Sequence, residues 1–226
     1  MNNLPKHIAF IMDGNGRWAS MRGMPRAYGH KKGVETVELV IDHCLKRGIS
    51  YVSLYVFSTE NWKRPTEEVN GLFDLAKRYF VKLTDFRKKN IKIVVSGEAK
   101  GLPSELNAEI KKAEKETENN TAMTVNLCIN YGGRTEIVNA VNEAIKNREK
   151  IINEDVLRKY MYRDLPDPDI IVRTGGHMRL SNFLLFQSAY SELFFTDILW
   201  PDYSAKDIDD VLDIYSKRQR NYGGLK

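Results

Sequence analysis

Four short segments of this 226-residue chain are rich in glycine, arginine, asparagine and serine. Glycine lets the backbone approach a ligand and turn successive N–H groups toward an anion, and arginine makes planar two-point contacts with phosphate. One such segment alone is more often a plain turn with a solvated arginine. Four of them, each after a predicted strand, favour a ligand that carries at least one diphosphate. The segments are Asp13–Trp18, Ser58–Arg64, Asn130–Arg134 and Arg173–Asn182.

Two carboxylates have the chemistry to hold a hard cation near these segments. Asp13 follows the first apolar run, and Glu192 precedes a second one. Mg²⁺ binds through one or two carboxylates together with substrate phosphates, so two acids would suffice, although each acid alone is commonly an ordinary surface group. The nucleotide P-loop and the dinucleotide glycine motif are both absent. Cys44 and Cys128 lie in apolar segments without zinc spacing, which predicts that they are core residues.

The elements that must position these segments follow from the hydrophobic pattern. Continuous apolar runs alternate with helical patterns, which predicts an α/β fold with a central, mostly parallel sheet flanked by helices. Ligands bind beyond the carboxyl ends of the strands in such sheets, where the four segments would lie. With no repeat and no long linker, we expect a single domain over residues 1–226. The predicted strands are 7–12, 49–57, 91–96, 124–130 and 169–173, and the predicted helices are 34–45, 66–86, 104–119, 137–145 and 208–215.

Composition narrows the class of protein but does not choose the ligand. The chain carries 35 Lys and Arg against 30 Asp and Glu, and this net charge of +5 permits nucleic acid, anionic lipid or phosphorylated metabolites. No apolar run approaches the ~20 residues that a membrane-spanning helix needs. The first ten residues lack a secretory pattern, and two cysteines argue against a disulfide framework. We therefore expect a cytoplasmic protein.

Longer blocks around these residues resemble the cis-prenyltransferase family, most closely its bacterial undecaprenyl diphosphate synthases. The resemblance runs from His7 to Gly224, and ordered blocks of this length are far more specific than a lone glycine motif. The blocks cover residues 7–19, 29–30, 57–62, 130–134, 173–176, 179–185 and 199–202.

The resemblance implies a Mg²⁺-dependent homodimer that condenses isopentenyl diphosphate repeatedly onto farnesyl diphosphate. Each addition would create a Z double bond, and an apolar tunnel would hold the growing chain. A C55 product, the precursor of a lipid carrier for cell-wall synthesis, is the default, although the sequence leaves the product length open. We expect no nucleic acid partner. Because such a lipid product cannot be left in water, we also expect the enzyme to touch the membrane transiently when it releases the product.

Roles for individual residues are carried over in the same way. Asp13 is the expected catalytic aspartate and Mg²⁺ ligand, and Glu192 is the expected second Mg²⁺ carboxylate. The allylic diphosphate is expected at Gly14, Asn15, Gly16, Arg17, Arg26 and His30, bordered by Trp18; the isopentenyl diphosphate at Arg173, Arg179 and Ser181, next to Leu180; and a closing loop at Ser58, Thr59, Glu60, Asn61, Trp62 and Arg64.

Some histidines and one asparagine have competing roles. The family places Asn61 near the proton that isopentenyl diphosphate loses, but a neutral amide is a very weak base. We therefore expect Asn61 to orient a group, with diphosphate or Asp13 accepting the proton. His30 could instead cap a helix or pack in the core, yet its position at an expected helix start suits phosphate. We expect His7 to pack at the start of its strand and His43 to lie on the surface.

The chain departs from the family pattern at two positions. His177 stands where the family has glutamate after Arg-Thr-Gly-Gly, and Phe186 stands where tryptophan is common. We expect His177 to make isopentenyl binding weaker or sensitive to pH. In the C-terminal tail, Arg220 resembles a family residue that reaches toward the active site of the other subunit.

Two segments have a structural interpretation beside a functional one. Residues 209–213 spell the D-D-x-x-D motif of trans-prenyltransferases, but a single copy at helical spacing favours a solvated helix face, with Ser204 and Asp207 as its cap. The apolar stripe between Leu72 and Phe86, on a helix that Thr66 would cap, is core in one interpretation and part of the tunnel wall, with Val56, in the other.

Two further functions compete with a catalytic prenyltransferase. The first is a non-catalytic partner subunit of the same fold, which the presence of Asp13, Arg17 and the later arginines disfavours. The second is a single-stranded RNA binder that uses Trp18, Trp62 and Tyr131 for stacking. Carboxylates placed among the arginines disfavour that function, because they would repel a nucleic acid backbone.

Overall fold

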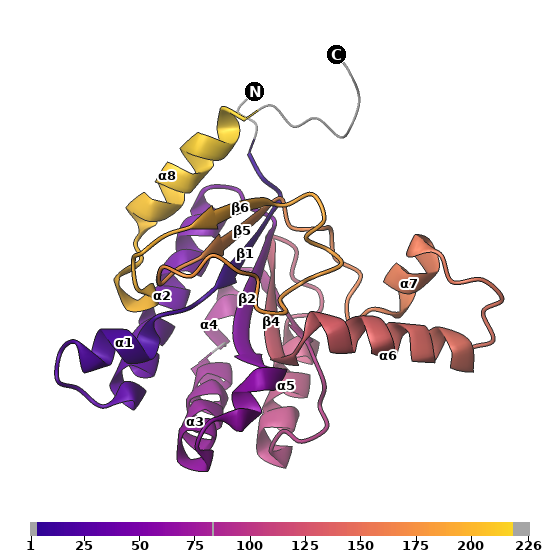
Figure 1. Ribbon diagram of the computed structural model, residues 1–226, viewed down its shortest axis with the longest axis horizontal. Helices are drawn as coiled ribbons and strands as arrows, with labels where there is room; N and C mark the ends of the chain where they lie inside the picture. Colours follow the sequence, from indigo (N-terminus) through magenta and orange to yellow (C-terminus); the bar gives the residue numbers. More distant parts are fainter. Residues whose placement is uncertain (1–3, 83, 219–226) are drawn as a thin grey trace. The chain divides into compact units, whose positions relative to one another are not determined.

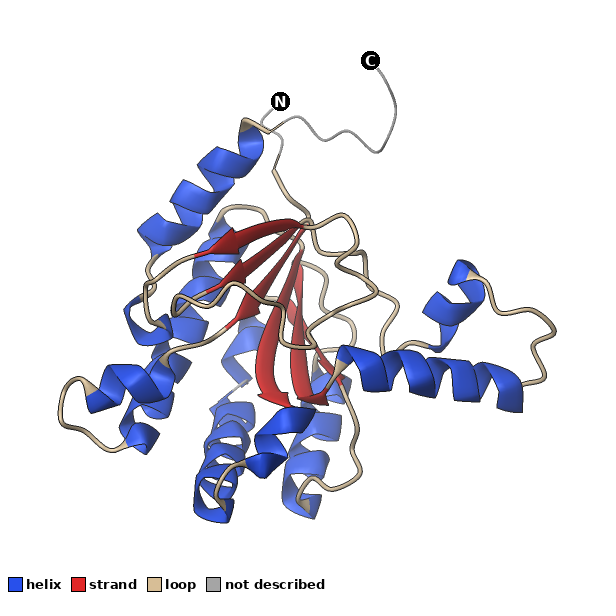
Figure 2. Cartoon of the chain, viewed as in Figure 1, coloured by secondary structure: helices blue, strands red, loops and turns tan. Residues whose placement is uncertain are grey.

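The computed structural model of this chain describes residues 4–82 and 84–218, with residues 81, 82, 84 and 85 described by their backbone alone. In this described part, six strands form one parallel sheet in the order β3-β4-β2-β1-β5-β6. Figure 2 draws the strands in red. The α/β class predicted from the sequence is confirmed. The strands are β1 (His7–Ile11), β2 (Tyr51–Ser58), β3 (Ile91–Ser96), β4 (Met123–Tyr131), β5 (Ile170–Arg173) and β6 (Glu192–Phe195).

The chain divides into two compact units. Unit 1 comprises the described residues of Met1–Val52, Asp167–Arg179 and Gln187–Lys226, and unit 2 comprises those of Ser53–Pro166 and Leu180–Phe186. The α-helices, which Figure 1 labels, are α1 (Asn15–Ser20), α2 (Arg26–Lys46) and α8 (Ala205–Ser216) in unit 1, and α3 (Thr66–Lys82), α4 (Thr84–Lys88), α5 (Ser104–Glu116), α6 (Gly133–Lys146) and α7 (Glu154–Tyr160) in unit 2. Two 3₁₀ helices complete the list, η2 (Trp200–Asp202) in unit 1 and η1 (Thr59–Lys63) in unit 2. No helix of the described part is both long enough and apolar enough for a membrane crossing.

In unit 1, parallel pairing brings the ends of β1 and β5 together. Every residue of β1 is buried, as expected for a strand that is covered on both faces. Ile8 lies opposite Ile170 and Ile11 lies opposite Arg173, so the loops that follow the two strands start side by side. Helix α2 contacts α1, η2 and α8, and its buried face includes Val37, Val40 and Ile41.

In unit 2, β3 pairs with β4 in parallel, from Ile91 opposite Met123 to Ser96 opposite Cys128. Helix α3 contacts α4, α5 and η1, and helix α6 contacts α7. Phe73 and Phe80 of α3 are buried. The half-buried positions of the same helix, including Leu72 and Ala76, leave part of its apolar face uncovered.

One predicted helix cap was wrong and another is confirmed. The helix predicted over 66–86 corresponds to α3 and α4, and Leu83 of its stripe, which lies between them, is outside the described residues. Thr66 is the first helical residue and not the N-cap, because the helix begins directly after Pro65. The predicted cap of α8 is confirmed, since the backbone N–H and hydroxyl of Ser204 both donate to Asp207 Oδ2, at 2.8 and 2.6 Å.

The histidines outside the glycine-rich segments have structural partners. His7 is buried and its ring lies 5.9 Å from that of Tyr51, which confirms its predicted packing. His43 is half-buried, so its predicted surface position was wrong in part. Its Nε2 lies 2.8 Å from Asp209 Oδ1, and the same oxygen forms an ion pair with Arg47 Nε at 3.3 Å. Asp209 is thus engaged by basic side chains of unit 1.

Candidate functional site

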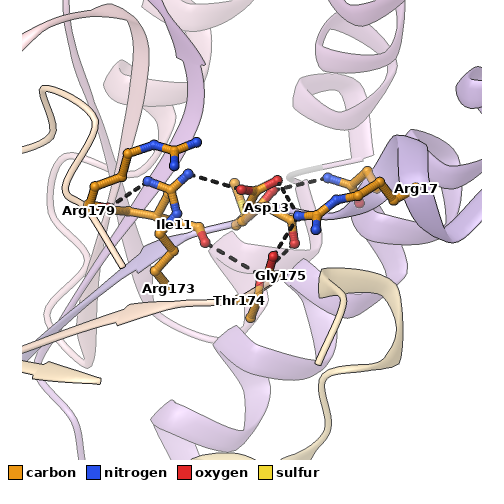
Figure 3. Close-up of polar contacts among 9 residues, drawn as sticks. Ile11, Asp13, Arg17, Arg173, Thr174, Gly175 and Arg179 are labelled. Carbon is orange, nitrogen blue, oxygen red and sulfur yellow. Dashed lines mark hydrogen bonds and ion pairs between the residues drawn. The ribbon is translucent and has the colours of Figure 1, made fainter. Parts of the chain in front are cut away.

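Asp13 lies between two arginine side chains in unit 1. Its Oδ1 accepts a hydrogen bond from Arg17 Nη2 at 3.2 Å, and its Oδ2 accepts one from Arg173 Nη2 at 2.9 Å (Figure 3). The Arg173 side chain is only 5% exposed, whereas those of Asp13 and Arg17 are 27% and 46% exposed. The carboxylate is therefore accessible from one side while a buried cation fixes it from the other. We call Asp13, Arg17, Arg173 and Gly175 the Asp13 cluster.

Local structure brings these residues together. Asp13 lies two residues beyond the end of β1, Arg17 lies four residues later on α1, and Arg173 ends β5 opposite Ile11. Asp13 itself lies in the loop before α1, and the Arg17 side chain reaches back across the Gly14 turn to its carboxylate. The two strands thus supply the carboxylate and the buried arginine, and α1 supplies the exposed arginine.

Glycine is required where the loop after β5 passes the Asp13 cluster. Gly175 and Gly176 have φ of +81° and +77°, a region that L side chains rarely adopt. A Cβ at Gly175 would lie 2.5 Å from Arg17 Nη2 and 3.0 Å from the carbonyl oxygen of Asp13. The close approach of this backbone is therefore part of how Arg17 reaches Asp13.

Backbone oxygens hold the cluster in place. Arg17 Nη2 donates to the Gly175 carbonyl at 2.7 Å, and Arg173 Nη1 donates to the Arg179 carbonyl at 2.6 Å. The Thr174 hydroxyl donates to the Asp13 carbonyl at 2.7 Å. With two guanidinium groups around one carboxylate, the cluster has a net positive charge and is suited to an anion. Thr174 was not predicted as a functional residue, although it lies within the resembling block 173–176.

The segment 14–18 forms the first turns of α1 and packs against α2. A Cβ at Gly16 would lie 2.6 Å from the Arg26 guanidinium carbon, so this arginine lies across the glycine. Asn15 Nδ2 donates to the Met12 carbonyl at 3.2 Å. Gly14 begins the turn with φ of +113°. Of the residues predicted for the allylic diphosphate, Arg17 and Arg26 thus bracket the glycine turn.

Trp18 is packed inward and is 7% exposed. Its Nε1 donates to Asp202 Oδ1 at 2.6 Å, its ring stacks on Tyr28 at 6.2 Å between centroids, and the Arg22 guanidinium lies 4.0 Å over the ring. Little of the ring is left for a ligand. Trp18 therefore holds α1 against its neighbours in unit 1, and an aromatic stacking platform for RNA is not available at this residue.

His30 does not lie at a helix start. Helix α2 begins at Arg26, so His30 falls in its second turn, and the predicted helix-terminal position was wrong by one turn. The helix begins directly after Pro25, its N-cap, so Gly29 lies within the helix, where its missing side chain lets the backbone oxygen of Asn15 approach. The N-terminus of α2 is instead occupied by Arg26.

Glu192 does not join Asp13 within one chain. It begins β6 opposite Ile170, whereas Asp13 follows the end of β1 that lies opposite Arg173. Three residue steps along a strand span roughly 10 Å, so the two carboxylates belong to opposite ends of their strands. Glu192 instead accepts a hydrogen bond from Arg218. Arg220, predicted to act across a dimer, lies outside the described residues.

His177 and Phe186, the two residues that depart from the family pattern, lie on the loop that follows β5, and this loop is exposed near its start. His177 is half-buried and Met178 is 81% exposed, directly after the two glycines. In unit 2, the ring of Phe186 lies 5.3 Å below the Arg158 guanidinium. This cation–π contact gives Phe186 a packing role.

In unit 2, the segment 58–64 forms a closed turn around η1. The backbone N–H of Ser58 donates to Asn61 Oδ1 at 3.1 Å, which caps the turn with the amide oxygen of Asn61. This oxygen is therefore engaged, and the NH₂ group is the part of Asn61 that faces other partners as a donor. The orienting role expected for Asn61 stays a prediction. Arg64 pairs with Glu68 at 3.1 Å and joins the turn to α3.

Trp62 anchors this turn. Its Nε1 donates to Asn130 Oδ1 at 2.8 Å, and its ring lies 5.3 Å from the rings of both Phe57 and Phe73. Asn130 has φ of +50°, and its amide donates to the carbonyl groups of Glu98 and Lys100. The turn is thus bound to the loop after β3 through Asn130, a residue whose type alone had suggested phosphate binding.

Asn182 makes the second attachment of the turn. Its Nδ2 donates to Glu60 Oε1 at 2.8 Å. Burial raises the pKa of Glu60, but hydrogen bonds from Asn182, from the backbone N–H of Glu60 and from the hydroxyls of Ser58 and Thr59 outweigh burial, and the pKa is lowered. Glu60 is therefore ionised at neutral pH. Asn182 was named only as the last residue of the segment Arg173–Asn182 and within a resembling block, and no role of its own was predicted for it.

The described residues contain no group of three or more His, Cys, Asp and Glu side chains arranged to hold a metal. A caged zinc or calcium site is thus missing from the described part of the chain. Asp13 offers a single exposed carboxylate beside cations. Such a group suits a cation that also binds the phosphates of a substrate, as Mg²⁺ commonly does.

Comparison with known proteins gives the family. The sequence matches the prenyltransferase family described as undecaprenyl diphosphate synthase over residues 11–223. An isoprenyl transferase of Fusobacterium nucleatum is 48% identical over 225 residues, which cover 99% of this chain and 98% of that protein. An isoprenyl transferase of Thermotoga maritima is 45% identical over 232 residues, which cover 98% of each.

Solved structures agree with the sequence matches. Lavandulyl diphosphate synthase from Lavandula x intermedia, crystallised with dimethylallyl diphosphate, has a TM-score of 0.92 at 30% identity over 98% of this chain and 99% of that chain. A Campylobacter jejuni protein described as a probable undecaprenyl diphosphate synthase has a TM-score of 0.85 at 34% identity over 99% of this chain and 100% of that chain. The chain is therefore a prenyltransferase enzyme that belongs to the undecaprenyl diphosphate synthase family of cis-prenyltransferases.

Proposed function

We propose that this enzyme condenses isopentenyl diphosphate repeatedly onto farnesyl diphosphate and releases a long-chain Z-polyprenyl diphosphate of C55 length. In each round the allylic carbon–oxygen bond breaks and diphosphate leaves with the bonding electrons. The isopentenyl double bond supplies the electrons of the new carbon–carbon bond. A proton then leaves the isopentenyl unit and a new double bond forms.

The Asp13 cluster is the observation that carries this proposal. Breaking the allylic bond builds negative charge on the leaving diphosphate, and preorganised cationic donors stabilise such charge best. Arg17 is half exposed and held by Asp13 and the Gly175 carbonyl, so its guanidinium is already oriented before a ligand arrives. In the proposed roles, Arg17 and Arg26 hold the allylic diphosphate with the glycine turn 14–16 and His30, while Arg173, Arg179 and Ser181 serve the isopentenyl diphosphate.

Mg²⁺ fits the donor chemistry of Asp13. A carboxylate is a hard oxygen ligand, and one carboxylate together with substrate phosphates is a common way for proteins to bind this cation. When bound, Mg²⁺ would neutralise charge on the leaving diphosphate. Asp13 would hold it, with Arg17 and Arg173 fixing the carboxylate. Glu192 of the same chain is not included, because it lies at the other end of its strand.

Asn61 orients a reacting group in this proposal. Its amide oxygen accepts from Ser58, which leaves its NH₂ group to donate to an anionic oxygen. A donor at this place would align the diphosphate that takes the proton, without taking the proton itself. An Asn61→Ala enzyme with normal turnover would contradict this role.

The growing chain requires an apolar surface, and α3 with the end of β2 supplies one within unit 2. Leu72, Leu75 and Ala76 of α3 and Val56 of β2 are half-buried, so an apolar face remains for the product. The depth of that face would set the product length. Because a C55 chain is expelled by water, we expect transient contact with a membrane when the product leaves.

We also propose that the enzyme is a homodimer. Unit 2 exposes large apolar side chains on α6 and on the loop that follows it: Val138 at 57%, Ile145 at 60% and Ile151 at 76%. Val138 and Ile145 are seven residues apart and share one helix face, and α6 and α7 lie together in Figure 1. Sedimentation of a Val138→Ser, Ile145→Ser variant as a monomer would support the dimer face, and unchanged sedimentation would contradict it.

The function is tested by incubating purified enzyme with labelled isopentenyl diphosphate, farnesyl diphosphate and Mg²⁺ and by separating the products by length. We expect a ladder that ends at C55 and disappears with EDTA. A ladder with another end point would contradict the proposed length but not the reaction. Absence of incorporation would contradict the reaction and favour a non-catalytic partner subunit, and salt-sensitive retention of RNA on a filter would favour the RNA binder.

A further inference from the structure

Asn182 connects three segments of unit 2 through both its backbone and its side chain. Its carbonyl accepts from the Gly133 N–H at 2.7 Å, and its Oδ1 accepts from the Arg134 N–H at 2.9 Å. Its Nδ2 donates to Glu60 Oε1 at 2.8 Å. The start of α6, the turn 58–64 and the loop after Arg179 are thus fastened at one residue.

The chain is shaped to receive this amide. A Cβ at Gly132 would lie 2.7 Å from Asn182 Nδ2 and 2.6 Å from Thr59 Oγ1, so the missing side chain of Gly132 makes room for both groups. Ser181 and Asn182 have φ of +49° and +67°. Asparagine adopts this left-handed region more readily than most residues, and serine follows only where its surroundings impose it.

The neighbours of Asn182 fix Ser181 as well. Tyr55 donates its hydroxyl to the Ser181 carbonyl at 3.2 Å, and its ring stacks on that of Phe183 at 4.5 Å between centroids. Ser181 and Phe183, the two neighbours of Asn182 in the chain, therefore both contact Tyr55, a half-buried residue of β2. Movement of Asn182 would shift Ser181, which the proposed function assigns to isopentenyl diphosphate.

Only an amide satisfies both partners of this side chain. The Arg134 N–H needs an acceptor, whereas the ionised Glu60 needs a donor. Aspartate would accept from Arg134 but would repel Glu60, and a shorter or apolar side chain would leave both groups without this partner. The arrangement thus selects asparagine at position 182 by hydrogen-bond polarity.

We propose that Asn182 is a positioning residue that couples the turn 58–64 to Ser181, so that the groups on both segments meet isopentenyl diphosphate in a fixed arrangement. This inference rests on the proposed function for its kinetic consequence. The contact with Glu60 is testable without it.

The kinetic test reverses the polarity of the contact. Asn182→Asp keeps the acceptor for Arg134 and destroys the donor to Glu60, whereas Glu60→Gln adds an NH₂ group that can donate to the introduced carboxylate in the double variant. We expect Asn182→Asp to raise KM for isopentenyl diphosphate about tenfold or more, in the range of one charge-assisted hydrogen bond. In the Glu60→Gln background, Asn182→Asp should raise KM for isopentenyl diphosphate by less than about threefold, because the hydrogen bond is restored with donor and acceptor exchanged.

Controls separate positioning from general damage. Asn119→Asp makes the same charge change at an exposed position of the turn that follows α5 and should leave KM as it is. A purely structural role would lower the melting temperature and the amount of active enzyme without changing KM. An unchanged KM in Asn182→Asp, or an equal cost in both backgrounds, would overturn the inference.

A second measurement distinguishes failure of the contact from failure of the proposed function. NMR titration of Glu60 in Asn182→Gly, which tolerates the positive φ, should show its pKa rising toward the ordinary glutamate value as a lowering hydrogen bond is lost. An unchanged pKa would overturn the contact. A raised pKa in a protein whose wild-type form incorporates no isopentenyl diphosphate would overturn the proposed function and leave the contact established.

Discussion

Arg173 and Arg17 bind the same carboxylate, yet their loss should have very different effects on stability. We compare Arg173→Met with Arg17→Met, since methionine keeps much of the side-chain volume without the charge. The Arg173 side chain is 5% exposed and that of Arg17 is 46% exposed. Removing one partner of a buried ion pair costs about 3–5 kcal/mol, because it leaves an uncompensated charge. Exposed pairs contribute about 1 kcal/mol or less.

For Arg173→Met we expect a loss of unfolding free energy near the lower end of the range of about 3–5 kcal/mol. Asp13 is 27% exposed and keeps Arg17 as a partner, so the charge left behind is partly solvated and partly paired; about 3 kcal/mol is then expected. For a chain of this length, 1 kcal/mol shifts the melting temperature by roughly 2–4 °C, which gives about 6–12 °C for Arg173→Met. The same conversion gives no more than roughly 2–4 °C for Arg17→Met.

The assay is thermal unfolding followed by circular dichroism, with urea unfolding as a check on the free energy. The rate of isopentenyl incorporation is measured in parallel at a temperature below the melting transitions of both variants. Each variant should lose about 10²-fold or more of the wild-type rate. The reasoning would be refuted by equal melting shifts in the two variants, or by a smaller shift in Arg173→Met than in Arg17→Met. Either result would mean that burial of the Arg173 guanidinium does not control its contribution.

Three other outcomes are expected. Asp209→Asn should leave incorporation nearly unchanged, because Asp209 pairs with basic side chains of unit 1; strong loss would revive the D-D-x-x-D motif. Burial, with Asp209 second, raises the pKa of Cys44 to about 12. As the pH rises, the unfolded chain therefore loses the thiol proton first, at about pH 8.5, which favours unfolding. The free energy of unfolding of the wild type, measured in urea relative to that of Cys44→Ala, should fall from about pH 8 to 10. A constant difference between the two free energies would contradict this prediction. KM for isopentenyl diphosphate should change in His177→Gln, because His177 follows the two glycines that pass the Asp13 cluster, and an unchanged KM would exclude His177 from isopentenyl binding.

Much of the fold could be predicted because buried parallel strands are continuous apolar runs. Strands β1, β3, β4 and β5 lie within a residue or so of their predicted ranges. Strand β6 was missed, since its four residues begin with Glu192 and include the 40%-exposed Leu193, so that it shows neither a long run nor a clean alternation. Its place in the sheet comes from pairing with β5, which local sequence does not encode.

Helix α1 was also missed, and the error carried over to His30. Helix α1 has only six residues, and two of them, Asn15 and Gly16, have low intrinsic helix propensity. The helix exists because α2 packs against it where Gly29 allows close approach. A pattern search within either segment alone could not find a contact that depends on both.

Residue types were enough to predict which residues belong to the candidate site, but not which of them contact each other. Asp13 and Arg173 are 160 positions apart and meet because Ile11 lies opposite Arg173 in the register of β1 and β5. The register of β5 and β6, in which Glu192 lies opposite Ile170, separates Glu192 from Asp13, although the two were predicted from the sequence to form one metal site. Asn130 and Asn182 act through left-handed backbone and amide polarity, features that a sequence motif does not display.

The central claim is that Asp13 and its arginines drive ionisation of an allylic diphosphate. The most direct measurement is the single-turnover rate of labelled isopentenyl diphosphate incorporation onto farnesyl diphosphate by wild type and by Asp13→Asn, both confirmed as folded by circular dichroism at the assay temperature. We expect the wild-type rate to require Mg²⁺ and Asp13→Asn to lose about 10²-fold or more. Incorporation by Asp13→Asn at the wild-type rate would contradict the account.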